Sequence, residues 1–259
     1  MPLYEHYAAT PRAKMMAELG WEVRRVGEEL HGSAVVVPEM CAPGTDHLRT
    51  SILALWVDIL VGLQAVDVTR PRVPVTVELD VHLTVPAPGS GRVLGMAKIV
   101  KAGRAVIVAD TRFTTGEGDP IAFGGATFMA TPDDRAEIDW GHSLEEATPA
   151  GGPLAVPFAK RVGCERTAPG VATLPSSEEV LNAAKTINGG LIALAAEEAA
   201  LSLTPGATLS SLALRYLQPA RIGPVVATAT AFRGLGQVEV RDAGNDSRLC
   251  MTATCRWFP

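Results

Sequence analysis

Two apolar segments of this chain each carry carboxylates near the middle, and this repeated feature constrains the fold most. The segment 50–65 is apolar around Asp58, and the segment 189–203 is apolar around Glu197 and Glu198. Near-continuous hydrophobicity predicts helices that are buried on most of their circumference. A buried carboxylate is costly unless it is paired, hydrogen-bonded or functional. The repetition therefore predicts an internal duplication built around a site.

Strand patterns follow each predicted helix. Residues 74–85 alternate apolar and polar, which is typical of a half-buried antiparallel strand. The apolar face of this strand is expected to carry Val75, Val77, Leu79, Val81, Leu83 and Val85. Further strands are expected over 93–101, 105–114 and 121–130, and in the second half over 208–218, 225–233, 237–242 and 248–257.

The start of each half is also predicted to be similar. Thr10-Pro11 opens a short helix to about Leu19, and a hairpin over 21–40 is expected to turn near His31-Gly32. Residues 166–174 predict a second, shorter hairpin before the second helix. The Pro-, Gly- and acid-rich stretch between the halves predicts a linker. We expect an N-terminal domain at 1–135, a linker at 136–155 and a C-terminal domain at 156–259, in the α+β class.

Composition excludes several functions. The net charge of −5 argues against general nucleic-acid binding, which needs a basic surface. Every 18-residue apolar run contains a charge, so no membrane span is expected, and the first residues lack the apolar core of a signal peptide. The four cysteines (Cys41, Cys164, Cys250 and Cys255) lack metal-binding spacing. These features predict a cytoplasmic protein with free thiols and no metal.

The residues at the second helix start carry a resemblance. Asn188-Gly189-Gly190 followed by LIALAAEEA resembles the His-Gly-Gly…Asp helix start of the phenylacetyl-CoA thioesterase-like (PaaI-like) hotdog family. Asp58 with Gly62 four residues later resembles the second part of that motif. The resemblance implies two tandem hotdog domains, each a curved antiparallel sheet wrapped around one central helix. It also implies an acyl-CoA thioesterase that needs no cofactor beyond the coenzyme A of its substrate.

Helix geometry predicts a composite site between the repeats. A rise of 1.5 Å per residue places Asp58 about 13 Å from the start of its own helix. Asp58 must therefore act against the start of the other helix, where free N–H groups and the helix dipole favour a developing oxyanion. The resemblance implies that Gly189 donates this N–H, and that Asn182 and Thr76 orient water or the acid. It places Asn188 and Gly190 beside the substrate.

The second composite site is predicted to be degenerate. It would join Glu197 to Arg49-Thr50-Ser51, which replaces the His-Gly-Gly element. Pro43 stands at the position matching Asn182, and Leu209 at the position matching Thr76. This half-site lacks the glycines, the amide and the hydroxyl of the first. One working site per chain is expected, with Asp58 as general base or nucleophile.

Structural alternatives stay open for several of these residues. Thr76 shares the polar face of its strand with Glu78, Asp80 and His82, which would leave it solvated. Gly189 and Gly190 could serve close packing alone, Asn182 could be a loop residue, and Glu198 is expected to face solvent. The candidate cations for binding the phosphates of coenzyme A are Lys101, Arg104, Arg92, Arg221 and Arg233.

Two other functions compete with hydrolysis. A non-catalytic acyl-CoA or lipid-binding hotdog protein is the main alternative, because both halves depart from His-Gly-Gly. A hotdog hydratase is disfavoured, because such enzymes place a histidine five residues after an aspartate near the helix start. Here Asp46 and His47 are adjacent. A homodimer of tandem chains is a further possibility.

Overall fold

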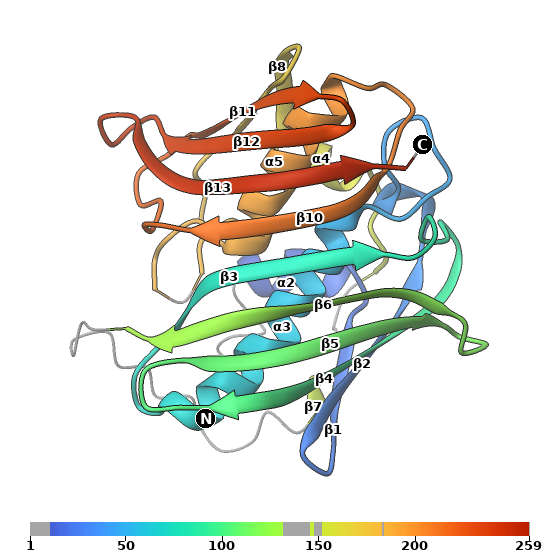
Figure 1. Cartoon of the computed structure of the whole chain (residues 1–259), viewed down its shortest axis with the longest axis vertical. Coiled ribbons are helices and arrows are strands. Elements are labelled where there is room, and N and C mark those ends of the chain that lie inside the picture. Colours follow the sequence, from blue (N-terminus) through green and yellow to red (C-terminus); the bar gives the residue numbers. More distant parts are fainter. Residues whose placement is uncertain (1–10, 132–145, 148–151, 183, 259) are drawn as a thin grey trace.

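The computed structural model describes residues 11–131, 146–147, 152–182 and 184–258. Within this part of the chain, the strands form one 13-stranded antiparallel sheet. The two long helices α3 (Thr50–Thr69) and α5 (Gly189–Ser202) pack against one face of the sheet and against each other (Figure 1). The protein is therefore of the α+β class, with a large antiparallel sheet and few helices.

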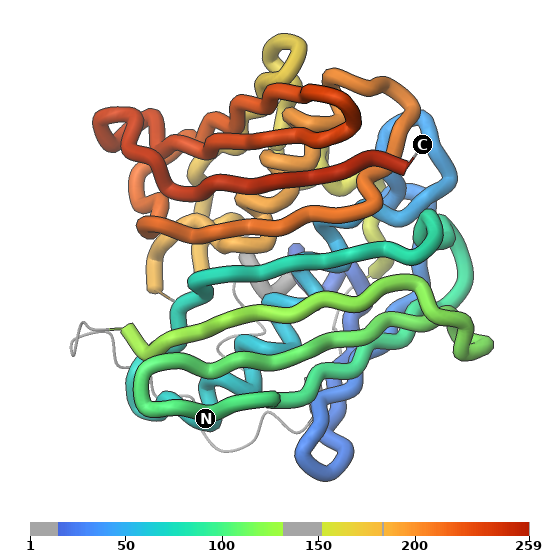
Figure 2. The backbone as a smooth tube through the Cα atoms, viewed as in Figure 1, coloured from blue at the N-terminus to red at the C-terminus, as the bar shows by residue number. Residues whose placement is uncertain are grey.

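The sheet is assembled from two adjoining halves of the sequence (Figure 2). The first half contains α2 (Pro11–Glu18), β1 (Glu22–Val26), β2 (Glu29–Val36), η1 (Pro38–Met40), α3, β3 (Pro74–Leu83), β4 (Gly91–Ala102), β5 (Ile107–Thr115) and β6 (Pro120–Ala130). The linker contains β7 (Glu146–Ala147). The second half contains α4 (Phe158–Arg161), β8 (Glu165–Ala168), β9 (Val171–Leu174), α5, β10 (Leu209–Tyr216), β11 (Val225–Phe232), β12 (Leu235–Asp242) and β13 (Arg248–Trp257). The strand order is β7-β1-β2-β4-β5-β6-β3-β10-β13-β12-β11-β9-β8.

The two halves meet where β3 pairs with β10. Asp80 lies opposite Ala213, its counterpart 133 residues later. Leu79 pairs with Leu214, and Val81 pairs with Leu212, so the pairing is reciprocal under the same offset. The strands are therefore related by an approximate two-fold axis through the Asp80–Ala213 pair.

Helix α3 is the centre of the first half. It is the only helix of the described residues that is long and apolar enough to cross a membrane, but 67% of its most apolar 18-residue window is buried inside this fold. Trp56 is fully buried and stacks on Trp21 with ring centroids 4.2 Å apart. We therefore assign α3 as the core helix of the first half.

The first hairpin turns earlier than the sequence predicted. The turn lies at Gly27-Glu28, where Gly27 has a φ of +61° that favours glycine. Gly32 lies within β2 instead, and a Cβ atom there would come within 2.2 Å of the Trp21 ring. The prediction of a turn near His31-Gly32 was wrong, because Gly32 accommodates a packed indole. The predicted hairpin over 166–174 is confirmed as β8 and β9.

A β-bulge interrupts the predicted alternation of β3. Thr76 pairs with Phe128, but Glu78 pairs with Thr127, which leaves Val77 as the extra residue. Since paired residues share a face, Thr76 lies on the same face as the buried Phe128. The prediction that Thr76 shares the solvated face of Glu78 was wrong, because the bulge shifts the alternation. A register shift between Leu209 and Ser211 repeats this bulge in β10, 133 residues later.

The predicted linker at 136–155 lies mostly outside the described residues. Its described part includes β7, which pairs with β1, and Leu154, which is buried and donates its N–H to Glu18 O. The domain limits at 135 and 156 stay predictions.

Candidate active site

Asp58 lies half-buried on α3 and accepts a hydrogen bond from a strand residue. The Thr76 hydroxyl donates to Asp58 Oδ1 at 2.8 Å. This contact exists because the bulge at Val77 turns Thr76 toward α3. A bulge of this kind commonly redirects one side chain beside a functional site. The structure thus joins two of the residues selected from the sequence.

The start of α5 approaches Asp58 because the two long helices cross closely. A Cβ atom on Gly190 would lie 2.4 Å from Leu55 Cδ1 and 3.0 Å from Leu55 Cα. Asp58 follows Leu55 by three residues, so both lie on the same face of α3. Gly190 therefore permits the helix contact that brings Asp58 toward the α5 N-terminus.

Tyr216 contacts this helix start, and the sequence analysis did not predict it. Its hydroxyl donates to Gly189 O at 2.9 Å, and its ring would lie 3.2 Å from a Cβ on Gly189. Burial raises the pKa of Tyr216 well above its ordinary value, and the nearby charge of Asp58 raises it further. Tyr216 therefore stays neutral and donates its hydroxyl hydrogen bond to Gly189.

Asn188 caps α5 with its own side chain. Its Oδ1 accepts from Gly190 N at 3.0 Å and from Leu191 N at 3.3 Å. Among the described residues, no hydrogen bond uses the N–H of Gly189. At the first position of a helix, this N–H lies in the positive end of the dipole. Within the Asn188-Gly189-Gly190 motif, the Gly189 N–H is therefore the one that can donate a hydrogen bond to an oxyanion.

Asn182 is engaged within its own loop. Its Oδ1 accepts from Ala184 N and Thr186 N, and its Nδ2 donates to Thr186 Oγ1 at 2.8 Å. These bonds close the turn before α5 and none of them reaches Asp58. Asn182 therefore forms a loop, which is the alternative to a role beside the acid that the sequence analysis left open.

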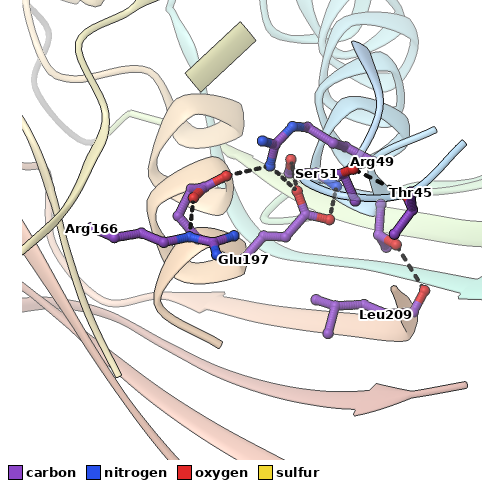
Figure 3. A network of polar contacts seen from close by, with 9 residues as sticks. Thr45, Arg49, Ser51, Arg166, Glu197 and Leu209 are labelled. Carbon is purple, nitrogen blue, oxygen red and sulfur yellow. Dashed lines mark hydrogen bonds and ion pairs between the residues drawn. The ribbon is translucent and has the colours of Figure 1, made fainter. Parts of the chain in front are cut away.

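The corresponding position at the start of α3 holds a buried ionic network (Figure 3). Glu197 accepts from Ser51 N at 3.2 Å, from the Ser51 hydroxyl, and from Arg49 Nη1 at 3.3 Å. Arg49, the N-cap residue, makes no side-chain cap of its own. The carboxylate of Glu197 therefore caps α3 from the neighbouring helix.

Glu198 extends the network, and its predicted exposure to solvent was wrong. It is only 3% exposed. Its Oε1 forms an ion pair with Arg49 Nη1 at 2.5 Å, and its Oε2 accepts from Arg166 Nε at 2.6 Å. Burial alone would lower the pKa of Arg49, but Glu197 and Glu198 raise it above its ordinary value. Tertiary pairing with two arginines explains why adjacent acids on a helix can both be buried.

The second half-site lacks the polar groups of the first. Leu209, the counterpart of Thr76, is fully buried, and its carbonyl accepts from Thr50 Oγ1 at 2.9 Å. Pro43, the counterpart of Asn182, is exposed in the loop before α3. The two helix starts thus differ in kind, since one is capped by Asn188 and the other by Glu197.

The predicted phosphate-binding cations divide between the two ends of the sheet. Ala102, Ile107, Phe128 and Thr76 are paired in one row across β4, β5, β6 and β3. Lys101 therefore lies about 15 Å from the Thr76 position, at three inter-strand spacings. Arg104 follows the end of β4 and Arg221 follows the end of β10. Both strands terminate at this end of the sheet, whereas β4 begins and β11 terminates at the opposite end (Figure 1). Arg92, near the start of β4, and Arg233, after β11, are therefore at that opposite end.

A separate groove of about 560 Å³ lies on the outer face of the sheet. Glu78, Asp80, His82, Asp110 and Phe123 contribute to its lining. This face is opposite to the one that Thr76 and Leu79 present to the helices, so the groove does not include Asp58. No group of three or more His, Cys, Asp or Glu side chains among the described residues is arranged to hold a metal ion.

Comparisons with known proteins show the fold. No protein-family model matches the chain, and no curated protein sequence matches it. The structure is similar to an acyl-ACP thioesterase from Bacteroides thetaiotaomicron, with a TM-score of 0.63 and 14% identity over 89% of this chain and 98% of that one. It is also similar to the 12:0-ACP thioesterase from Umbellularia californica, with a TM-score of 0.66 and 13% identity over 91% and 99% of the two chains. The chain thus has a fold that is found in thioesterases.

Proposed function

We propose that this protein is an acyl thioester hydrolase with one composite site between two tandem hotdog units. The observation that carries the proposal is the close contact of the α5 start with Leu55, one helical turn from Asp58, whose carboxylate is held by Thr76. The similarity of this fold to the folds of two thioesterases supports thioester hydrolysis as the reaction. The reciprocal pairing of β3 with β10 supports the tandem arrangement.

The chemistry follows from the groups at this site. Asp58 takes a proton from water while the water oxygen attacks the thioester carbon, and the Gly189 N–H stabilises the resulting oxyanion by about 3 kcal/mol. Collapse of this intermediate breaks the C–S bond, and the departing sulfur takes the proton from Asp58. In a second route with the same geometry, Asp58 attacks the thioester carbon and the C–S bond breaks, which leaves an anhydride and a thiolate. Water then hydrolyses the anhydride to the free acid and the Asp58 carboxylate, and the thiolate takes the released proton.

Thr76 and Tyr216 act in this proposal as positioning residues. The Thr76 hydroxyl fixes the rotamer of Asp58 through its bond to Oδ1. The Tyr216 hydroxyl holds the Gly189 carbonyl, while Asn188 holds the Gly190 N–H at the other end of the same peptide. This pair of bonds fixes the first turn of α5 and therefore the direction of the Gly189 N–H.

The proposed substrate is an acyl-CoA. An acyl group on an acyl carrier protein is the second candidate, because two structures that cover about nine-tenths of this chain are described as acyl-ACP thioesterases. A non-catalytic acyl-CoA or lipid-binding protein is the alternative to hydrolysis. We also propose that the protein is cytoplasmic, that it acts on a small thioester and not on nucleic acid, and that two tandem chains form a homodimer.

Release of thiol from a panel of acyl-CoA and acyl-carrier-protein thioesters tests the reaction. Aryl, short-chain and long-chain acyl groups should be included, and turnover of at least one is expected. Saturable binding without turnover in every class would favour the binding protein instead.

Charge reversal at one end of the sheet should weaken the use of CoA thioesters. The double variant Lys101→Glu/Arg104→Glu is expected to lower kcat/KM for an acyl-CoA roughly 10-fold, because the phosphates lose cations on the side of the site. The matched pair Arg92→Glu/Arg233→Glu changes the net charge equally at the opposite end and should have little effect. Equal losses in both double variants would show that only net charge matters.

A further inference from the structure

We propose that the N-terminus of α3, together with Ser51 and Arg49, is a binding site for a small carboxylate, and that Glu197 is its built-in occupant. This site is separate from the one that contains Asp58. The ligand class that fits this site once Glu197 is removed is a one- or two-carbon carboxylate such as formate or acetate.

The donors at this site have the composition of an anion-binding site. The Glu197 carboxylate receives a backbone N–H from the first turn of a 20-residue helix, a hydroxyl from Ser51 and a guanidinium N–H from Arg49. Helix N-termini bind anions through these free N–H groups and the dipole. Arg49 Nε is buried and has no hydrogen-bond acceptor among the described residues, so the guanidinium keeps one unused donor.

Charge balance explains why an external anion would be attracted after removal of Glu197. Arg49 and Arg166 are balanced by Glu197 and Glu198 within the network. Two buried thiols near this network add no charge to it. Burial, together with the nearby carboxylates, raises the pKa of Cys164 and of Cys255 to about 12, so both thiols stay neutral. Without Glu197, the network keeps two cations and one anion, together with an uncapped helix start.

The two-fold relation of the halves indicates what the occupant replaces. Ser51 corresponds to Gly190 and Glu197 to Asp58, each pair being 139 residues apart. At the start of α5 the cap comes from Asn188, which leaves the Gly189 N–H unused among the described residues. At the start of α3, a side chain of the protein itself occupies the position of the anion. This contrast explains, on the proposed function, why one chain has one reactive site.

Thermal unfolding of Glu197→Ala in sodium formate, compared with sodium chloride at equal ionic strength, tests the proposal. Formate should raise the Tm of this variant by several degrees and the rise should saturate, because a ligand that binds only the folded state stabilises it. The control Leu60→Ala removes a buried α3 side chain away from the helix start and should show no formate-specific rise. Adding Ser51→Ala to Glu197→Ala should shift saturation to higher formate.

Two results would overturn the proposal. The first is a formate effect on Glu197→Ala no larger than that on Leu60→Ala or on the wild type. The second is an unchanged Tm in Glu197→Gln, which can be measured even where Glu197→Ala does not fold. This variant keeps the size of the side chain but removes its charge, so a wild-type Tm would show that no anion is needed. Because these readouts measure stability, they do not depend on whether the Asp58 site hydrolyses thioesters.

Discussion

Replacing Asp58 by asparagine should lower kcat for thioester hydrolysis by about 100- to 10,000-fold, the range for loss of a general base. Asparagine keeps the size of the side chain and can still accept the Thr76 hydroxyl, so the fold and the bulge should be retained. The amide, however, neither takes a proton from water nor attacks the thioester. Steady-state hydrolysis of the best substrate in the panel, with the Tm measured alongside, checks this.

Glu197→Gln is the matched control for this loss of activity. It neutralises the corresponding carboxylate on the other central helix, which is bound to Ser51 and Arg49 rather than facing a glycine helix start. Well below its Tm, it should turn over substrate at a rate close to the wild type. Equal losses of kcat in the two variants would contradict the assignment of a single site to Asp58.

Replacing Arg49 by alanine should destabilise the protein by about 3–5 kcal/mol. Arg49 is 1% exposed, and its removal leaves the carboxylates of Glu197 and Glu198 buried with only Arg166 to pair with them. Breaking one partner out of a buried ionic network typically has an effect of this size. Urea unfolding followed by circular dichroism measures the change in the free energy of unfolding.

Arg25→Ala provides the comparison for an exposed pair. Arg25 contacts Asp67, and the two side chains are 35% and 38% exposed. Exposed ion pairs contribute at most about 1 kcal/mol, so this variant should be close to the wild type. If Arg49→Ala destabilised the protein no more than Arg25→Ala, the network would not be the structural element described here.

Much of the fold could be predicted from the sequence, because its signals are local. The apolar run around Asp58 and the alternation after Pro74 correctly indicate a buried helix and a half-buried strand. The turn at Gly27 was missed, since Gly32 has the same composition signal and only the packing of Trp21 distinguishes the two. The bulge at Val77 was also missed, because it is defined by pairing with β6, which no local pattern records.

The site was predicted less completely, since it depends on contacts between distant segments. The pairing of Asp58 with Thr76 was selected by resemblance, although the strand pattern argued against it. Tyr216 carried no local signal, because its contact with Gly189 requires β10 to lie beside β3 and α5 to begin at that point. Glu198 was assigned to solvent because its partners, Arg49 and Arg166, are far away in the sequence.

A crystal structure with a non-hydrolysable ketone analogue of the best acyl-CoA substrate tests the central claim most directly. The account predicts that the carbonyl oxygen lies about 2.7–3.1 Å from Gly189 N, with the Asp58 carboxylate beside the carbonyl carbon. Glu197 should remain bound to Ser51 in the same crystal. An analogue bound at the start of α3, or in the groove on the outer face of the sheet, with Asp58 untouched, would contradict it.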